Sequence, residues 1–287
     1  MKPSLLLTIT STISTAFDRL NSIPSTDPEL TPENWRKIQP CVTFKLGSKD
    51  IILTQPTSSF FVYLLGLLTL GVGLKFLHLQ GEEESRLWWG ISLILWGVGA
   101  LLAGTSYQAF GYNIKCKGRK VCAWTSWWEV IYLIFQQISI DALLVATALS
   151  CTQGKLQIVL ISFALFCAVG YAIMTFIGGL IPVKPLITFE WMVWISLPAF
   201  LINCILNGWR YYKFSSSMDL ALLGAWAGLF FTMLAYWLYN KLGITQKLWA
   251  KRIWFSQNDV LHIGLILWVV YLAAVVSNRV LDYPAAI

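Results

Sequence analysis

The chain has 287 residues, of which 57% are hydrophobic and 12% are charged, and its formal net charge is +7. A soluble domain usually carries about 25% charged residues, so this composition excludes a soluble globular enzyme. Lys and Arg lie in the breaks between long apolar runs, where they set membrane topology rather than bind nucleic acid. We therefore expect a multi-pass, all-α membrane protein and no DNA or RNA partner.

Residues 1–57 precede the first long apolar run and predict a separate N-terminal membrane-surface region. The apolar patch at 5–9 is too short for the core of a secretory signal. Two β-prone runs between residues 42 and 53 flank Gly47 and Ser48, which predicts a small β-hairpin. Helical spacing of apolar residues predicts a short amphipathic helix on the membrane surface, through Leu6, Ile9, Ile13, Ala16, Phe17 and Leu20.

Residues 58–287 are expected to form a seven-helix transmembrane bundle. Crossing the hydrocarbon core takes about 20 helical residues, and seven apolar runs are long enough. Many of the 15 Trp residues lie near the ends of these runs, as in interfacial aromatic belts. The predicted spans are 58–77, 87–107, 126–150, 156–177, 189–206, 219–239 and 258–277.

The distribution of positive charge predicts the orientation of the bundle. Of the 21 Lys and Arg residues, 15 lie on the side of the N-terminus and the other six lie on the opposite side. The positive-inside rule then places the N-terminus in the cytoplasm and the C-terminus on the far side. Cys116 and Cys122 fall in a loop on the cytoplasmic side, where they are expected to stay reduced. A bridge between them would argue against this orientation.

The third predicted span contains an acid near mid-membrane, where an unpartnered polar group is costly. Asp141 lies about 15 residues into this span, and Gln137 lies one turn earlier on the same face. Either Asp141 fixes helix packing through hydrogen bonds, or it lines a cavity or site.

The seventh span opens with a second group of polar residues. Ser256 and Asp259 match a capping box, as do Ser126 and Glu129 at the start of the third span, so capping is the default role of both acids. His262 follows Asn258 by four residues and Asp259 by three, so all three side chains can face the bundle. His262 is either a packing residue or part of a site.

The second span ends in a glycine-flanked polar segment at 104–111, which includes Ser106, Tyr107 and Gln108. The predicted topology brings this segment to the same side as the starts of the third and seventh spans. Convergent polar groups in an apolar bundle are typical of a ligand site. We expect Gln108, Asp141 and His262 to converge around a cavity that opens toward the cytoplasmic leaflet.

These motifs resemble the CREST superfamily of seven-span membrane hydrolases, which includes alkaline ceramidases and the adiponectin and progestin receptors. The resemblance implies a zinc ion held by one His at the end of the second span and by an H-x3-H at the start of the seventh, with a Ser in the second span and an Asp in the third. Ser106 to Gln108, Asp141 or Gln137, and Asn258 to His262 stand at these places. The stretch 51–112 also resembles an uncharacterised bacterial relative of this group.

The chain departs from the family at the zinc ligands. Gln108 and Asn258 stand where two of the three His ligands are expected, and the whole chain has two His. Zinc is therefore disfavoured as a cofactor, because neutral amide oxygens are poor ligands for it. The leading hypothesis is a hydrolase-related bundle that binds a membrane lipid or lipid-like ligand without turnover, or that serves as a membrane partner subunit. The alternative is a metal- or His-dependent lipid amide or ester hydrolase that uses His262 with Asp141 and Asp259 as catalytic residues.

Two other classes of membrane protein fit the sequence less well. A retinal-binding rhodopsin needs a Lys in the seventh span, and residues 258–277 contain none. A transporter is expected to show paired interrupted helices or an internal repeat, whereas Pro198 interrupts the fifth span alone.

Overall fold

The computed structural model describes residues 18–47 and 49–283, and they form the all-α bundle that the sequence predicts. Each predicted span is present as a helix that is long and apolar enough to cross a membrane. The largest difference is in the fifth helix, which continues from the predicted end at residue 206 to Phe214. Among the described residues, the seven helices that could span a membrane are α3 (Pro56–His78), α4 (Glu84–Ala103, continued by the π-helix η1, Gly104–Ala109), α6 (Trp127–Cys151), α7 (Gly154–Leu180), α8 (Phe189–Phe214), α9 (Ser217–Lys241) and α11 (Gln257–Tyr271, continued by the π-helix η3, Leu272–Val276).

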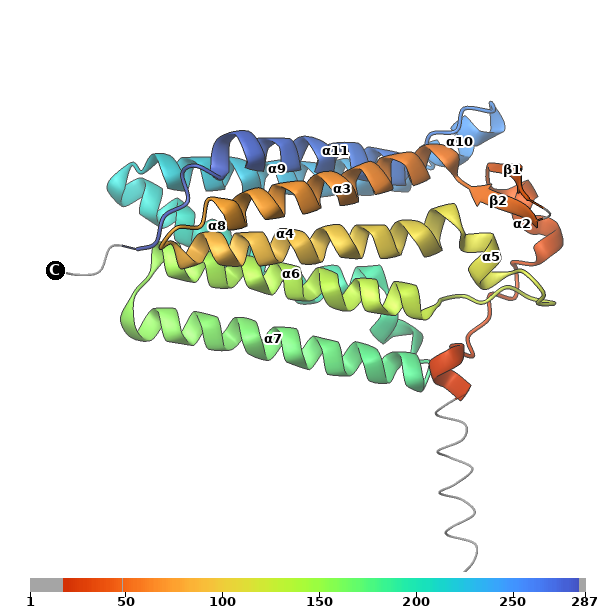
Figure 1. Ribbon diagram of the computed structural model, residues 1–287, viewed down its shortest axis with the longest axis horizontal. Coiled ribbons are helices and arrows are strands. Elements are labelled where there is room, and N and C mark those ends of the chain that lie inside the picture. Colours follow the sequence, from red (N-terminus) through yellow and green to blue (C-terminus); the bar gives the residue numbers. More distant parts are fainter. Residues whose placement is uncertain (1–17, 48, 284–287) are drawn as a thin grey trace, which may run out of the picture.

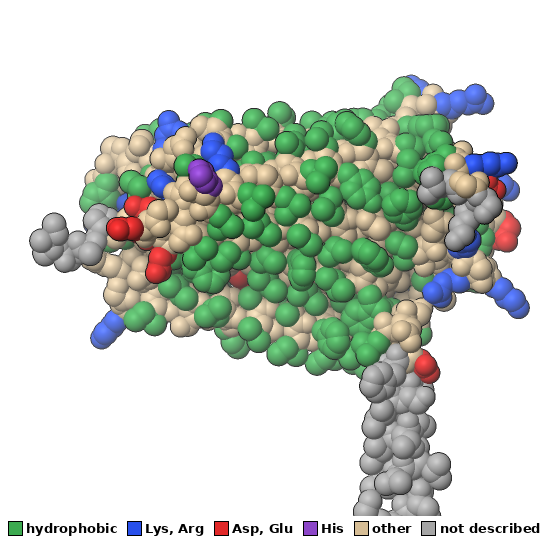
Figure 2. Space-filling model, viewed as in Figure 1, with side chains coloured by type: hydrophobic (Ala, Val, Ile, Leu, Met, Phe, Trp, Pro, Cys, Tyr) green, Lys and Arg blue, Asp and Glu red, His purple; other side chains and the backbone are tan. Residues whose placement is uncertain are grey.

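The distribution of side chains supports an integral membrane protein. The long helices run side by side along the long axis of the molecule (Figure 1). On the face shown in Figure 2, hydrophobic side chains cover the middle and the charged side chains gather at the two ends. An apolar girdle between two polar ends is what a lipid bilayer requires of a helical protein.

The two ends of the bundle differ in structure. The hairpin end is where α3, α6, α8 and α11 begin, and the C-terminal end is the opposite one (Figure 1). The predicted β-hairpin is confirmed, with Gly47 in the left-handed conformation at its turn. The predicted amphipathic helix falls mostly on residues 1–17, outside the described residues. The short elements of the hairpin end are α2 (Pro32–Ile38), β1 (Cys41–Leu46), β2 (Lys49–Thr54), α5 (Gly111–Lys115), η2 (Lys184–Ile187) and α10 (Ile244–Ala250).

The expectation of reduced cysteines in the loop before α6 is wrong, because Cys116 and Cys122 form a disulfide. The loop folds back on itself, and the Ala123 N–H donates to the carbonyl of Lys115 across its base. This closure holds the two Cα atoms 4.3 Å apart. Both cysteines are buried against Trp35 of α2. The expectation had followed from the charge-based orientation and not from loop geometry.

Glycines allow α3 and α4 to pack closely. A Cβ added to Gly97 would lie 2.9 Å from the carbonyl oxygen of Gly66, and one added to Gly73 would lie 3.1 Å from that of Gly90. Backbone therefore meets backbone at two levels of this helix pair, as at small-residue interfaces in membrane proteins. The contact fixes α4, which carries part of the site described below.

Candidate functional site

A cavity of about 240 Å³ lies between α3, α4, α6, α8, α9 and α11. Its wall is mainly apolar and aromatic, with Trp96, Phe200 and Trp226 among its residues. The cavity is slightly smaller than the usual range of about 300 to 1,000 Å³ for small-molecule sites. The polar side chains on the wall are Gln136, Ser196, Asn203 and His262, besides the phenol of Tyr132, and no Lys, Arg, Asp or Glu in the described part of the chain lines it.

His262 is the one residue of the predicted site that lines this cavity. Its side chain is buried, at 7% exposure, and its Nδ1 has no hydrogen-bond partner within the described chain. The predicted capping box at the start of α11 is confirmed: the Ser256 N–H donates to the Asp259 carboxylate. Ser58 of α3 also donates to Asp259, at 3.1 Å. These bonds fix the first turn of α11 and hold His262 against the cavity, while half-buried Asn258 donates its N–H to Ser256.

Asp141 is buried in the bundle and does not line the cavity. Gln137 Nε2 donates to Asp141 Oδ2 at 3.0 Å, and Ser196 Oγ donates to Gln137 Oε1 at 2.7 Å. Because Ser196 lines the cavity, a chain of two hydrogen bonds leads from the cavity wall to Asp141. The other carboxylate oxygen of Asp141 has no partner among the described residues.

The polar segment at the end of the second span belongs to a different cluster. Ser106 Oγ donates to Glu129 Oε1 at 2.7 Å, and Lys115 Nζ contacts the same oxygen at 2.7 Å in a buried ion pair. Glu129 therefore does not cap α6 as the sequence suggested, and Ser126 makes no capping bond through its side chain. The Glu129 carboxylate instead links α6 to Ser106 of η1 and to Lys115 of α5. Ser106 does not line the cavity.

Tyr107 and Gln108 flank this cluster. The Tyr107 ring packs edge-on against Tyr132, which lines the cavity, with ring centroids 6.1 Å apart. Gln108 is 5% exposed, and its Oε1 has no partner within the described residues. It is not among the residues of the cavity wall.

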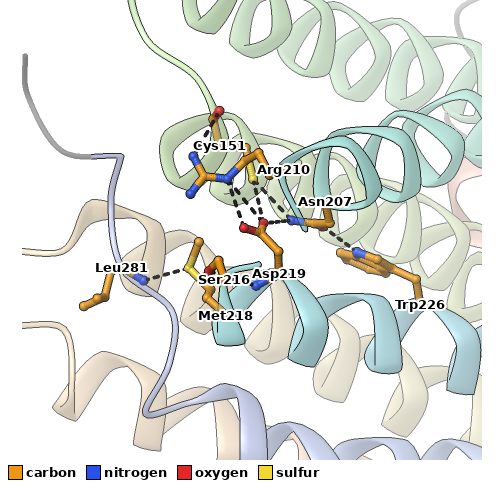
Figure 3. Close-up of polar contacts among 8 residues, drawn as sticks. All are labelled: Cys151, Asn207, Arg210, Ser216, Met218, Asp219, Trp226 and Leu281. Carbon is orange, nitrogen blue, oxygen red and sulfur yellow. Dashed lines mark hydrogen bonds and ion pairs between the residues drawn. The ribbon is translucent and has the colours of Figure 1, made fainter. Parts of the chain in front are cut away.

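A second buried ion pair lies at the C-terminal end and was missed by the sequence analysis. Arg210 of α8 contacts Asp219 of α9 at 3.2 Å, and Asn207 Nδ2 donates to the same carboxylate at 3.0 Å (Figure 3). Asn207 also accepts a hydrogen bond from the indole of Trp226, whose ring lines the cavity. The sequence analysis ended the fifth span at residue 206 and so assigned Arg210 to a loop. An Asn and an Arg one turn apart in a continued helix could have indicated this contact.

The donor set does not fit a three-ligand metal site. His262 faces the cavity, whereas Gln108 and Asp141 do not. No group of three or more His, Cys, Asp or Glu in the described part of the chain is arranged to hold a metal ion.

Comparisons of the chain with protein-family models, with curated proteins and with solved structures found no match.

Proposed function

We propose that this integral membrane protein binds a lipid-like ligand in the cavity beside His262 and does not turn it over. The observation that carries the proposal is a largely apolar cavity with a few polar side chains, one of which is the buried His262, whose Nδ1 has no partner among the described residues. Such a combination suits a ligand with an apolar body and a small polar group. Leaving a buried polar group without a partner costs about 1 to 3 kcal/mol, and a ligand that hydrogen-bonds to the part of the His262 imidazole that faces the cavity would reduce the cost of burying this side chain.

The arrangement of the acids favours binding over hydrolysis. A His that acts as a general base is usually oriented by a carboxylate within hydrogen-bond reach. Asp259 is engaged with Ser256 and Ser58 instead, and Asp141 is separated from the cavity by Gln137 and Ser196. The alternative of a lipid amide or ester hydrolase would need both acids to rearrange. The resemblance to the CREST superfamily stays a prediction, and it is compatible both with lipid binding and with hydrolysis.

Native mass spectrometry of the protein, purified in a mild detergent, tests this proposal. We expect a bound species of lipid mass that survives detergent removal and can be extracted with organic solvent. A partner subunit with an empty cavity would instead show the bare chain or a second protein.

We infer further that the hairpin end faces an oxidising compartment, because thiols in a reducing cytoplasm rarely form stable disulfides. This is the reverse of the orientation that the positive charges predict. One of those charges, on Lys115, is paired with Glu129 inside the bundle and is withdrawn from the lipid headgroups. Labelling of intact cells distinguishes the two orientations: Lys247→Cys at the hairpin end should react with an impermeant maleimide and Glu82→Cys should not. The opposite pattern would restore the charge-based orientation.

A further inference from the structure

The polar groups of the cavity indicate which class of lipid it selects, an inference that rests on the proposed function. Among the described residues, no Lys, Arg, Asp or Glu side chain lines the cavity. The two buried cations of the described chain, Lys115 and Arg210, are each paired with a carboxylate elsewhere. An ionised carboxylate, phosphate or amine in this cavity would therefore lose its hydration without gaining a counter-charge, which is strongly unfavourable.

The hydrogen-bonding capacity of the wall matches a hydroxyl group. An imidazole that is buried without a carboxylate partner is most stable in its neutral form, which has one donor and one acceptor nitrogen. A hydroxyl group likewise donates one hydrogen bond and accepts others, whereas a carboxylate only accepts. The amide of Gln136 adds a further donor and acceptor on the same wall.

The positions of these residues orient the ligand. With a rise of 1.5 Å per residue, His262 lies about 8 Å from the start of α11, and Ser196 lies about 10 Å from the start of α8. Asn203 lies deeper, at about 21 Å, and its Oδ1 is also unpartnered in the described chain. Trp226 lies about 22 Å from the end of α9, at the level of Asn203. A bound lipid whose chain runs parallel to the helices, as lipid chains do in the bilayer, would thus have its polar group near His262 and its chain directed toward Trp226.

We propose that the cavity selects neutral long-chain lipids with a hydroxyl group, and that His262 is the hydrogen-bond partner of that hydroxyl. The site discriminates against fatty acids and other ionised amphiphiles because it offers no counter-charge. His262 is accordingly a residue that determines specificity for the polar group, while the aromatic wall accepts the chain.

A set of probes with the same chain tests this proposal: 11-bromoundecanol, ionised 11-bromoundecanoate and 1-bromoundecane. Bromine at the chain end should quench the fluorescence of tryptophans next to it, including Trp96 and Trp226. At pH 9 and constant detergent we expect the alcohol to bind about tenfold or more tightly than the carboxylate. Equal or tighter binding of the carboxylate would overturn the selectivity while leaving the proposed function intact. Quenching by none of the three probes would contradict the proposed function itself.

Two variants test the assigned partner of the hydroxyl. In the wild type, a hydrogen bond from the hydroxyl to His262 should make 11-bromoundecanol bind more tightly than 1-bromoundecane. In His262→Phe we expect the alcohol to lose this advantage in affinity, whereas the matched control His78→Phe, away from the cavity wall, should keep it. Asn203→Leu should also keep it, because we place the hydroxyl near His262. Loss of the advantage in Asn203→Leu but not in His262→Phe would place the polar group deep in the bundle and overturn the assignment. Thermal unfolding in detergent checks that each variant is folded.

Discussion

The indole nitrogen of Trp226 donates a hydrogen bond to Asn207 Oδ1 at 2.8 Å. This bond joins the cavity wall to the buried ion pair at the C-terminal end, because Asn207 also donates to Asp219 (Figure 3). The Trp226 ring packs on Trp89 as well, with ring centroids 5.9 Å apart. One wall of the cavity is thus fixed in position by a hydrogen bond and by aromatic packing before any ligand binds.

The ion pair between Arg210 and Asp219 should be critical for stability. Asp219→Asn leaves Arg210 buried with no counter-charge, and we expect a loss of about 3 to 5 kcal/mol in the free energy of unfolding. The double variant Arg210→Met with Asp219→Leu should recover much of this loss because neither position then carries a buried charge. Thermal unfolding in detergent measures both effects. Lys213→Met, at an exposed position on the same helix, is the control and should change stability little. Equal stability of the Asp219→Asn variant and the wild type would show that the pair is not needed.

The close contact of α3 and α4 predicts a contrast between two glycines. In Gly97→Ala the new Cβ meets the backbone of Gly66, and we expect a loss of about 1 to 3 kcal/mol. Gly71→Ala, on α3 with open space around its Cβ, should be neutral or stabilising by up to about 1 kcal/mol. The measurement is the denaturation midpoint of each variant in the same detergent. A similar effect of the two substitutions would mean that the helices can separate at little cost.

The donor set around His262 predicts the metal content of the purified protein. With Gln108 and Asp141 off the cavity wall, we expect well under one zinc per chain by elemental analysis, and no change in thermal stability on adding a chelator. Stoichiometric zinc that is lost in His262→Ala but kept in His78→Ala would restore the enzyme hypothesis.

Much of the fold follows from patterns that are local in the sequence. Apolar runs longer than about 18 residues have one stable structure in a bilayer, so all seven spans were predictable. The turn at Gly47 and the capping box of Asp259 were predictable for the same reason, since each depends on residues close together in the chain. The disulfide was not, because it depends on how the loop between α5 and α6 folds back.

The site was predictable only in part, because it depends on which faces of different helices meet. Spacing along α11 correctly indicated that His262 faces into the bundle. Spacing along α6 put Gln137 and Asp141 on one face, but it could not show that Ser196 from α8 would lie between them and the cavity. The spacing of Ser126 and Glu129 predicted a cap. It could not show that Glu129 pairs with Lys115, because Lys115 lies in a separate helix.

Filling the cavity tests its proposed function most directly. Ala103 lines the cavity, so Ala103→Phe should occupy part of it, whereas Val169→Phe changes an exposed position on α7 and serves as the control. The measurement is the amount of lipid extracted per chain from each purified, folded variant, compared with the wild type. We predict a neutral lipid near one molecule per chain in the wild type and in Val169→Phe, and a loss of most of it in Ala103→Phe. Equal lipid content in all three proteins, with no species specific to the cavity, would contradict the account.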